Sequence, residues 1–272
     1  MLTRIVTAVV LLAVFLPIMY FSGTYVFDIA AALLSVTAVY ELVGCVGMRR
    51  DYAVCIPLYV YALAMPLYVE VSYKYEYHLT VLVIFALFTV AVFSKGRYSI
   101  EKTSALTAFS VYAVSSFTAL IILRRGEFGH YIIWLVFIGA WVTDTAAYFV
   151  GRFFGKHKLI PDVSPKKTVE GSVGGIVFCT AAYVLYGFLM EKFFDVNANL
   201  AALAVAGVIV SIVSQLGDLA ASKIKRHYDI KDFGKILPGH GGIMDRFDSI
   251  LAVAAFLLII TSRPDLIALF GI

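Results

Sequence analysis

The twenty residues at positions 200–219, LAALAVAGVIVSIVSQLGDL, contain one charged side chain, that of Asp218, and are otherwise mostly apolar. A run of this length can cross the roughly 30 Å hydrocarbon core of a bilayer as a helix. The composition of the 272-residue chain agrees, because 61% of its residues are hydrophobic, well above the roughly 45–50% of soluble domains. We therefore expect an all-α, polytopic integral membrane protein with a single membrane domain over residues 1–272.

Eight apolar runs are long enough to span a bilayer, and a ninth is inferred from its context. They cover residues 2–21, 25–46, 53–69, 78–93, 104–123, 131–150, 173–189 and 200–219. The final apolar run, residues 250–260, is too short, so its helix must begin near Ile243 or Met244. The sequence thus predicts about nine transmembrane helices. The first is interpreted as a helix and not as a removed signal peptide, because it lacks a small-residue cleavage site.

The distribution of basic residues predicts the orientation of these spans. With a cytoplasmic N-terminus, 17 of the 22 lysines and arginines fall on the cytoplasmic side, as the positive-inside rule requires. This arrangement places the two richest polar segments, residues 151–175 and 215–248, at the cytoplasmic face. We expect a multi-pass protein of the cell membrane whose active-site segments face the cytoplasm, where nucleotides are found.

Carboxylates within the spans mark a candidate site, because an ionisable group in hydrocarbon is costly and usually faces protein or water. Asp144 lies in the sixth span, Asp218 ends the eighth, and Asp245 and Asp248 open the ninth. Spacings of four and three place one polar stripe along the eighth helix and its extension, made of Ser211, Gln215, Asp218, Ser222 and Lys225. Glu41, in the second span, is a weaker candidate that fits a buried structural carboxylate better.

Asp218, Asp245 and Asp248 can converge if the eighth and ninth helices pack together, and three carboxylates repel each other unless a cation lies among them. Oxygen ligands favour Mg²⁺ or Mn²⁺, and Mg²⁺ commonly combines one or two carboxylates with substrate phosphates. We expect these aspartates to be metal ligands, with Asp144 as an additional candidate and with one cation or two. The alternative is a helix-capping and salt-bridge cluster without metal.

A glycine-rich turn, LPGHGGI at residues 237–243, connects the two helices. Gly239, Gly241 and Gly242 permit positive φ and a close approach of a ligand to backbone N–H groups, and the N-terminus of the following helix favours phosphate. Four nearby residues add full positive charge, namely Lys225, Arg226, Lys231 and Arg246. His240 is a candidate for contacting a phosphate or moving a proton, although a structural role suits an isolated histidine slightly better.

A second polar segment, residues 151–175, contains the motif SPKKT at residues 164–168. Lys166 and Lys167 can clamp a phosphate, and the hydroxyls of Ser164 and Thr168 can donate hydrogen bonds to it. Ordinary positive-inside charge accounts for Lys156 and Lys158 but less well for a proline and further glycines. We therefore expect the 164–168 motif to contribute to the binding site.

Several motifs together carry a resemblance to a known family. They are SKIKR at 222–226, KD at 231–232, Gly234, LPGHGGI at 237–243 and DRFD at 245–248, with upstream matches at 141–155, SPKKT at 164–168, EG at 170–171 and QLGD at 215–218. This pattern resembles that of CDP-diacylglycerol synthases, also called phosphatidate cytidylyltransferases. The resemblance implies a metal-dependent nucleotidyltransferase of phospholipid biosynthesis that converts CTP and phosphatidic acid to CDP-diacylglycerol and pyrophosphate at the lipid bilayer.

This reading assigns roles to two groups of residues. The catalytic group, which includes the expected metal ligands and CTP-binding cations, is Asp218, Lys225, Arg226, Lys231, Asp232, His240, Asp245, Arg246 and Asp248. The substrate-binding group is Ser164, Lys166, Lys167 and Thr168, placed at the lipid phosphate, with Gly239, Gly241 and Gly242. Asp232 either orients a neighbouring lysine or contacts the nucleotide. A homodimer is a further expectation, and no nucleic-acid partner is expected.

Two other functions stay open at the level of the sequence. One is a related CTP-using membrane enzyme acting on another lipid, such as a prenol kinase or an archaeal-type lipid cytidylyltransferase. The other is an ion-coupled transporter with a site at Asp144 and Glu41, although transporters place their polar groups near the midplane and here they gather at one face.

Overall fold

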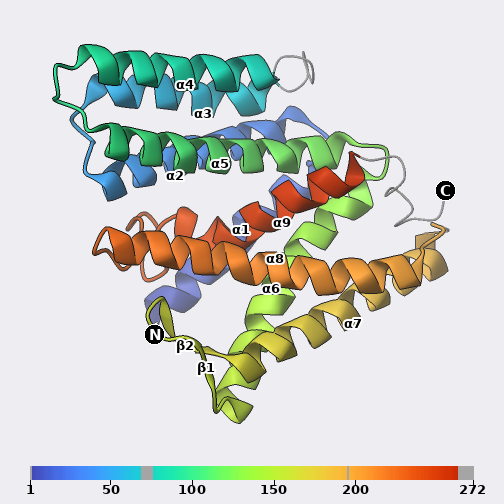
Figure 1. Cartoon of the computed structure of the whole chain (residues 1–272). Coiled ribbons are helices and arrows are strands. Elements are labelled where there is room, and N and C mark those ends of the chain that lie inside the picture. The colour runs from blue at the N-terminus through green and yellow to red at the C-terminus, as the bar shows by residue number, and fades with distance from the viewer. Residues whose placement is uncertain (1, 69–75, 195, 263–272) are drawn as a thin grey trace. The chain divides into compact units, whose positions relative to one another are not determined.

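The computed structural model describes residues 2–68, 76–194 and 196–262, which form nine helices and one hairpin of two strands (Figure 1). The elements in chain order are α1 Leu2–Tyr20, α2 Tyr25–Val46, α3 Tyr52–Tyr68, α4 Glu76–Phe93, α5 Ile100–Arg125, α6 Gly129–Phe154, β1 Lys158–Ile160, β2 Ser164–Thr168, α7 Val169–Phe194, α8 Leu200–His227 and α9 Met244–Thr261. Each predicted span corresponds to one helix, and α9 begins at Met244, as its short apolar run required. Residue 69, assigned to the third span, lies outside the described residues.

Five of these helices are long and apolar enough to cross a membrane, namely α2, α5, α6, α7 and α8. Helices α1, α3 and α4 are apolar but shorter over their described residues. Helix α9 carries Asp245, Arg246 and Asp248 in its first two turns. The prediction of an all-α integral membrane protein is therefore confirmed, while the count of nine crossings stays a prediction. The hairpin of β1 and β2 was not predicted.

The chain divides into two compact units. Unit 1 contains residues 1–125 and 227–247, and unit 2 contains residues 126–226 and 248–272. Helices α8 and α9 each contribute residues to both. The single membrane domain over the whole chain stays a prediction.

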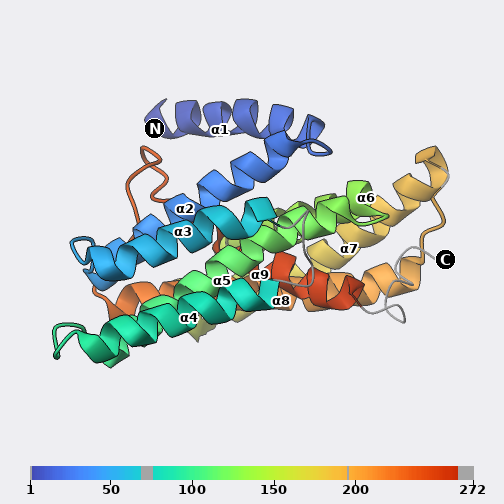
Figure 2. The same ribbon diagram turned by 90° about the horizontal axis from the view of Figure 1, so that it is seen from above.

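Unit 1 is built around α2, which packs against α3 and α5, while α4 packs against α3 and α5 (Figure 2). Its core is made of apolar side chains with no more than 1% exposure, including Val39, Leu42, Leu58, Leu106 and Phe117. Phe117 of α5 also contacts Phe247 of α9, with ring centroids 5.4 Å apart. This packing places the C-terminal half of α2 beside the segment that precedes α9.

Unit 2 is built around α6 and α7, which pack along their lengths. Helix α8 approaches α7 at Gly207, where an added Cβ would lie 2.8 Å from the Cα of Thr180. Polar side chains also join these helices: the Thr143 hydroxyl donates to Ser211 Oγ at 3.1 Å, and Gln215 Nε2 donates to the Ser172 carbonyl at 3.3 Å. The predicted polar stripe of α8 therefore faces neighbouring helices at Ser211 and Gln215.

Candidate functional site

Two candidate sites are present, one in each unit, and each is described separately. In unit 2, the end of α8 and the part of α9 from Asp248 onward bring two carboxylates together. Asp248 is buried, with 9% of its surface exposed, and lies within electrostatic reach of Asp218, Lys225 and Asp144. We call Asp144, Asp218 and Asp248 the carboxylate cluster. The sequence predicted that Asp218, Asp245 and Asp248 converge; Asp218 and Asp248 lie near each other, whereas the Asp245 carboxylate binds the N–H groups of Phe233 and Gly242 in the loop.

The approach of α8 to α9 depends on Gly217, which precedes Asp218. A Cβ at this position would lie 2.6 Å from the Cβ of Ala252 and 2.8 Å from the carbonyl oxygen of Asp248. Both distances are too short for real atoms, so only glycine permits this spacing of the two helices. Because residue 217 has no side chain, α8 and α9 pack closely enough to bring Asp218 and Asp248 near each other.

We expect Gly217→Ala to force α8 and α9 apart and to lower both thermal stability and turnover. Alanine favours a helix by about 1 kcal/mol relative to glycine, but overpacking at a close contact costs about 1–3 kcal/mol. Thermal unfolding and the initial rate of pyrophosphate release measure the two effects. Leu216→Ala, at a neighbouring exposed position of α8, is the control. Wild-type activity and stability in Gly217→Ala would contradict this account of the contact.

A lysine of the hairpin contacts the carboxylate cluster. Lys167 lies on β2, and its Nζ is 2.5 Å from Asp218 Oδ2. Asp218 Oδ1 also accepts a hydrogen bond of 3.4 Å from the Ser222 hydroxyl. The predicted inclusion of Lys167 in the same site as Asp218 is confirmed as a contact. A salt bridge at Asp218 is also what the metal-free alternative, a salt-bridge cluster, predicts.

Glu170, in the first turn of α7, holds the start of the hairpin. Both of its carboxylate oxygens accept hydrogen bonds of 3.2 Å from the backbone N–H of His157. Its Oε1 also lies 2.7 Å from His157 Nδ1. Since β1 begins at Lys158 and pairs with β2, this contact fixes the strand that carries Lys167.

The prediction that Thr168 faces a substrate phosphate is wrong. Its side chain is buried, and its Oγ1 accepts a hydrogen bond of 3.1 Å from the backbone N–H of Gly171. A Cβ added at Gly151, Gly155 or Gly171 would lie 2.7–3.0 Å from atoms of this side chain. Thr168 therefore caps the N-terminus of α7 and packs against three glycines. By contrast, Lys166 is exposed and Ser164 is partly exposed.

Metal coordination was expected at Asp218, Asp245 and Asp248. Among the residues that the structure describes, no group of three or more His, Cys, Asp and Glu side chains lies close enough to hold a metal ion. Asp218 and Asp248 nevertheless form a pair of oxygen donors of the kind that Mg²⁺ uses together with substrate phosphates. The pair fits such an ion, and coordination stays a prediction.

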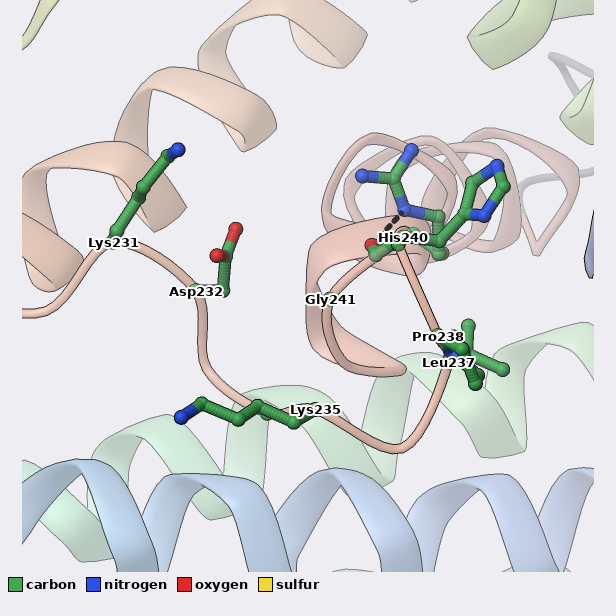
Figure 3. A pocket seen from close by; sticks show the side chains of 10 residues that line it. Lys231, Asp232, Lys235, Leu237, Pro238, His240 and Gly241 are labelled. Carbon is green, nitrogen blue, oxygen red and sulfur yellow. Dashed lines mark hydrogen bonds between the residues drawn. The ribbon is translucent and has the colours of Figure 1, made fainter. Parts of the chain in front are cut away.

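The second candidate site, in unit 1, is a cavity of about 640 Å³ formed by the loop between α8 and α9 (Figure 3). We call it the glycine-loop cavity. Figure 3 shows Lys231 and Asp232 on one limb of this loop and His240 on the other. The cavity is lined by Lys231, Asp232, Gly234, Lys235, Leu237, Pro238, Gly239, His240, Gly241 and Arg246. Three cationic side chains against one carboxylate make it a cavity for an anion.

The turn of the loop is held by its own backbone. The N–H of Leu237 donates to the Gly241 carbonyl, and the N–H of His240 donates to the Leu237 carbonyl, both at 2.9 Å. Gly239 and Gly241 have φ of 77° and 85°, values that side chains disfavour, so glycine is required there. Arg246 Nε donates to the His240 carbonyl at 2.9 Å, which fixes the guanidinium over the cavity.

His240 lines this cavity, and one nitrogen of its ring is buried. Within the described residues its Nδ1 is buried and has no hydrogen-bond partner. A buried polar atom left unpaired costs about 1–3 kcal/mol. A ligand in the cavity cannot reach this buried atom unless the ring shifts, so a contact of His240 with a substrate stays a prediction.

The position of Glu41 is the main feature that the sequence did not reveal. This residue of α2 is fully buried, and its carboxylate accepts hydrogen bonds of 2.9 Å from the backbone N–H groups of Ile243 and Met244. A Cβ added at Gly234 or Gly242 would lie 2.1–2.3 Å from Glu41 Oε1. Glu41 therefore caps the N-terminus of α9 and shapes the loop that encloses the cavity.

These contacts correct the prediction that the N-terminus of α9 binds phosphate. The N–H groups of Ile243 and Met244 are bonded to Glu41, and that of Gly242 donates to Asp245 Oδ2 at 3.0 Å. Asp245 Oδ2 also accepts from the Phe233 N–H at 2.8 Å. Glu41 and Asp245 thus accept hydrogen bonds from the N–H groups that the sequence assigned to a substrate phosphate. The cationic side chains of the loop stay candidates for binding an anion.

The chain was compared with known proteins. Residues 2–262 match the model of the cytidylyltransferase family. Phosphatidate cytidylyltransferases of Staphylococcus haemolyticus, Staphylococcus saprophyticus and Staphylococcus aureus are 37%, 38% and 36% identical to it. Each alignment extends over 263 residues and covers 94% of this chain and 97% of the relative.

Proposed function

This chain belongs to the cytidylyltransferase family, and from that membership we propose that it makes CDP-diacylglycerol and pyrophosphate from CTP and phosphatidic acid. The observation that carries the proposal is the similarity, along nearly the whole chain, to relatives named phosphatidate cytidylyltransferase. The glycine-loop cavity supports it, because its lysines and arginine suit a polyphosphate. The apolar helices provide the lipid environment that the acceptor needs.

The reaction joins two polyanions. A phosphate oxygen of phosphatidic acid attacks the α-phosphorus of CTP, a new P–O bond forms, and the bond to the β-phosphate breaks to release pyrophosphate. A phosphate monoester has a second pKa near 6, so the attacking group is largely a dianion at neutral pH. The protein therefore needs cations that offset repulsion more than it needs a strong base.

In this proposal, the cations of the glycine-loop cavity hold the departing pyrophosphate. Lys231 and Arg246 line the cavity together with His240, and Arg246 is oriented by its bond to the loop backbone. Fixed donors aimed at the leaving group stabilise the charge that develops on it.

Asp218 and Asp248 would hold Mg²⁺ or Mn²⁺ with the help of substrate phosphates. When bound, such an ion would lower the repulsion between nucleotide and lipid phosphates. Lys167, which contacts Asp218, would exchange part of this contact for the phosphate of phosphatidic acid. Lys166 and Ser164, on the same strand, are further candidates for that phosphate.

The proposed site faces the cytoplasm. The excess of basic residues on one side of the predicted spans supports this orientation.

A purified-enzyme assay tests this function. We expect full-length protein in detergent micelles to release pyrophosphate from CTP only with phosphatidic acid, and to lose this activity in EDTA and recover it with added Mg²⁺. A prenol and its phosphate serve as acceptor controls. Phosphorylation or cytidylylation of the prenol compounds without conversion of phosphatidic acid would contradict the proposed acceptor. Unchanged turnover in EDTA would contradict the metal assignment.

A further inference from the structure

A second cavity, of about 410 Å³, lies in unit 1 against the loop that forms the first. Tyr40 and Arg49, from the end of α2 and the turn after it, line this cavity together with Asp232, Phe233 and Lys235. We call it the Arg49 cavity. Its volume falls within the range of about 300–1,000 Å³ typical of small-molecule sites.

The two cavities share a wall. Asp232, Gly234 and Lys235 line both of them. Both cavities therefore border the same short segment and have different walls on their other sides. A ligand that occupied both would need a phosphate end and another, chemically distinct end.

The charges of the Arg49 cavity are balanced. Arg49 and Lys235 are its cations, and Asp232 and Glu41 are its carboxylates. Both oxygens of Glu41 are already engaged by backbone N–H groups, which leaves Asp232 as the acidic group for a ligand. By contrast, the glycine-loop cavity has three cations and one carboxylate. A neutral ligand group with donors and acceptors fits the Arg49 cavity better than a phosphate does.

The Arg49 guanidinium lies over the ring of Tyr40, and both groups line the cavity. The guanidinium carbon of Arg49 lies 4.6 Å from the centre of the Tyr40 ring. Nucleobases are commonly bound by stacking on aromatic rings or guanidinium planes, while other side chains read their hydrogen-bonding edge. Cytosine presents an amino donor beside two acceptors, which matches one carboxylate, Asp232, and the donors of Arg49 and Lys235.

We propose that the Arg49 cavity binds the cytosine of CTP, with Asp232 accepting from the exocyclic amino group and Arg49 donating to the ring acceptors. The inference rests on the proposed function, because it extends the nucleotide from the glycine-loop cavity. Uracil carries a carbonyl where cytosine carries the amino group, and that carbonyl would face the Asp232 carboxylate. Asp232 therefore selects CTP over UTP.

Nucleotide binding and turnover in full-length protein test this inference. We expect Arg49→Ala to raise the Kd for labelled CTP by about tenfold in equilibrium dialysis, since it removes one base-reading contact. The KM for phosphatidic acid and the affinity for pyrophosphate should stay unchanged, which shows that the variant is folded. We expect Asp232→Asn to reduce the preference for CTP over UTP by about fivefold or more, because an amide can either donate or accept. Arg50→Ala, one residue along and outside the cavity lining, is the matched control.

The outcomes separate the two proposals. Unchanged CTP affinity in Arg49→Ala and an unchanged CTP to UTP ratio in Asp232→Asn, in an enzyme that makes CDP-diacylglycerol, would overturn the cytosine site alone. Arg49-dependent binding of CTP in a protein that does not use phosphatidic acid would support the cytosine site and overturn the acceptor. Equal loss of pyrophosphate and CTP affinity in Arg49→Ala would place Arg49 at the phosphates and also overturn the inference.

Discussion

Asp248→Asn is expected to reduce turnover by about 10²-fold or more, the effect typical of removing one preorganised electrostatic group from an active site. Asp248 is buried and lies near Asp218, Asp144 and Lys225. Asparagine has nearly the same shape but no charge, so it cannot replace a carboxylate that holds a cation. Initial rates of pyrophosphate release from CTP measure the loss.

Thermal stability distinguishes a functional role of Asp248 from a structural one. Because two other carboxylates lie near it, removal of its charge should leave the melting temperature unchanged or raise it. Asp245→Asn provides the contrast, since the Asp245 carboxylate holds the Phe233 and Gly242 N–H groups, and we expect both activity and stability to fall. Lys192→Ala, in the last turn of α7, should change neither. Near-normal turnover in Asp248→Asn would remove Asp248 from the reaction.

The second large effect is expected from Glu41→Ala. This change leaves the N–H groups of Ile243 and Met244 unpaired in a buried place, at a cost of about 1–3 kcal/mol for each group. It also leaves an empty space beside Gly234 and Gly242, because the Glu41 carboxylate packs against both glycines in the wild type. We expect a lower melting temperature and at least about a tenfold loss of kcat/KM for CTP, comparable to the loss of an orienting group next to a ligand.

A graded series separates positioning from simple stability. Glu41→Gln keeps one acceptor oxygen but turns an amide NH₂ toward the other N–H group, so its activity should lie between those of the wild type and Glu41→Ala. Rates are measured well below the melting temperature of each variant. Glu101→Ala, at an exposed position in the first turn of α5, is the control. If Glu41→Ala has a lower melting temperature but normal turnover of CTP at low temperature, then Glu41 does not position the loop.

The helices could be predicted closely because hydropathy alone determines where a chain of this kind is helical. The ninth helix is instructive, since the shortness of its apolar run placed its start near Ile243 or Met244 and put Asp245 and Asp248 on it; the helix begins at Met244. The polar spacing along α8 likewise predicted which side chains face other helices. The number of membrane crossings does not follow in the same way, because helix length and apolarity are necessary for crossing but do not by themselves show it.

Contacts between distant segments could not be predicted. Glu41 is 202 residues from Ile243, and no spacing rule links a lone carboxylate to N–H groups that far along the chain. For the same reason we predicted from the sequence that these N–H groups bind a phosphate, whereas they donate hydrogen bonds to the Glu41 carboxylate. The hairpin was missed because its strands have only three and five residues and are largely exposed, so they lack the apolar alternation that marks a strand.

The contact of Glu41 with the start of α9 has a consequence for biosynthesis. A ribosome makes α2 long before it makes residues 243 and 244, and contacts between distant segments can form only after both have been synthesised. The loop that encloses the proposed nucleotide site therefore closes as one of the last events of folding. We therefore expect a nascent chain to lack this contact, and with it a formed nucleotide site, until the start of α9 has been synthesised.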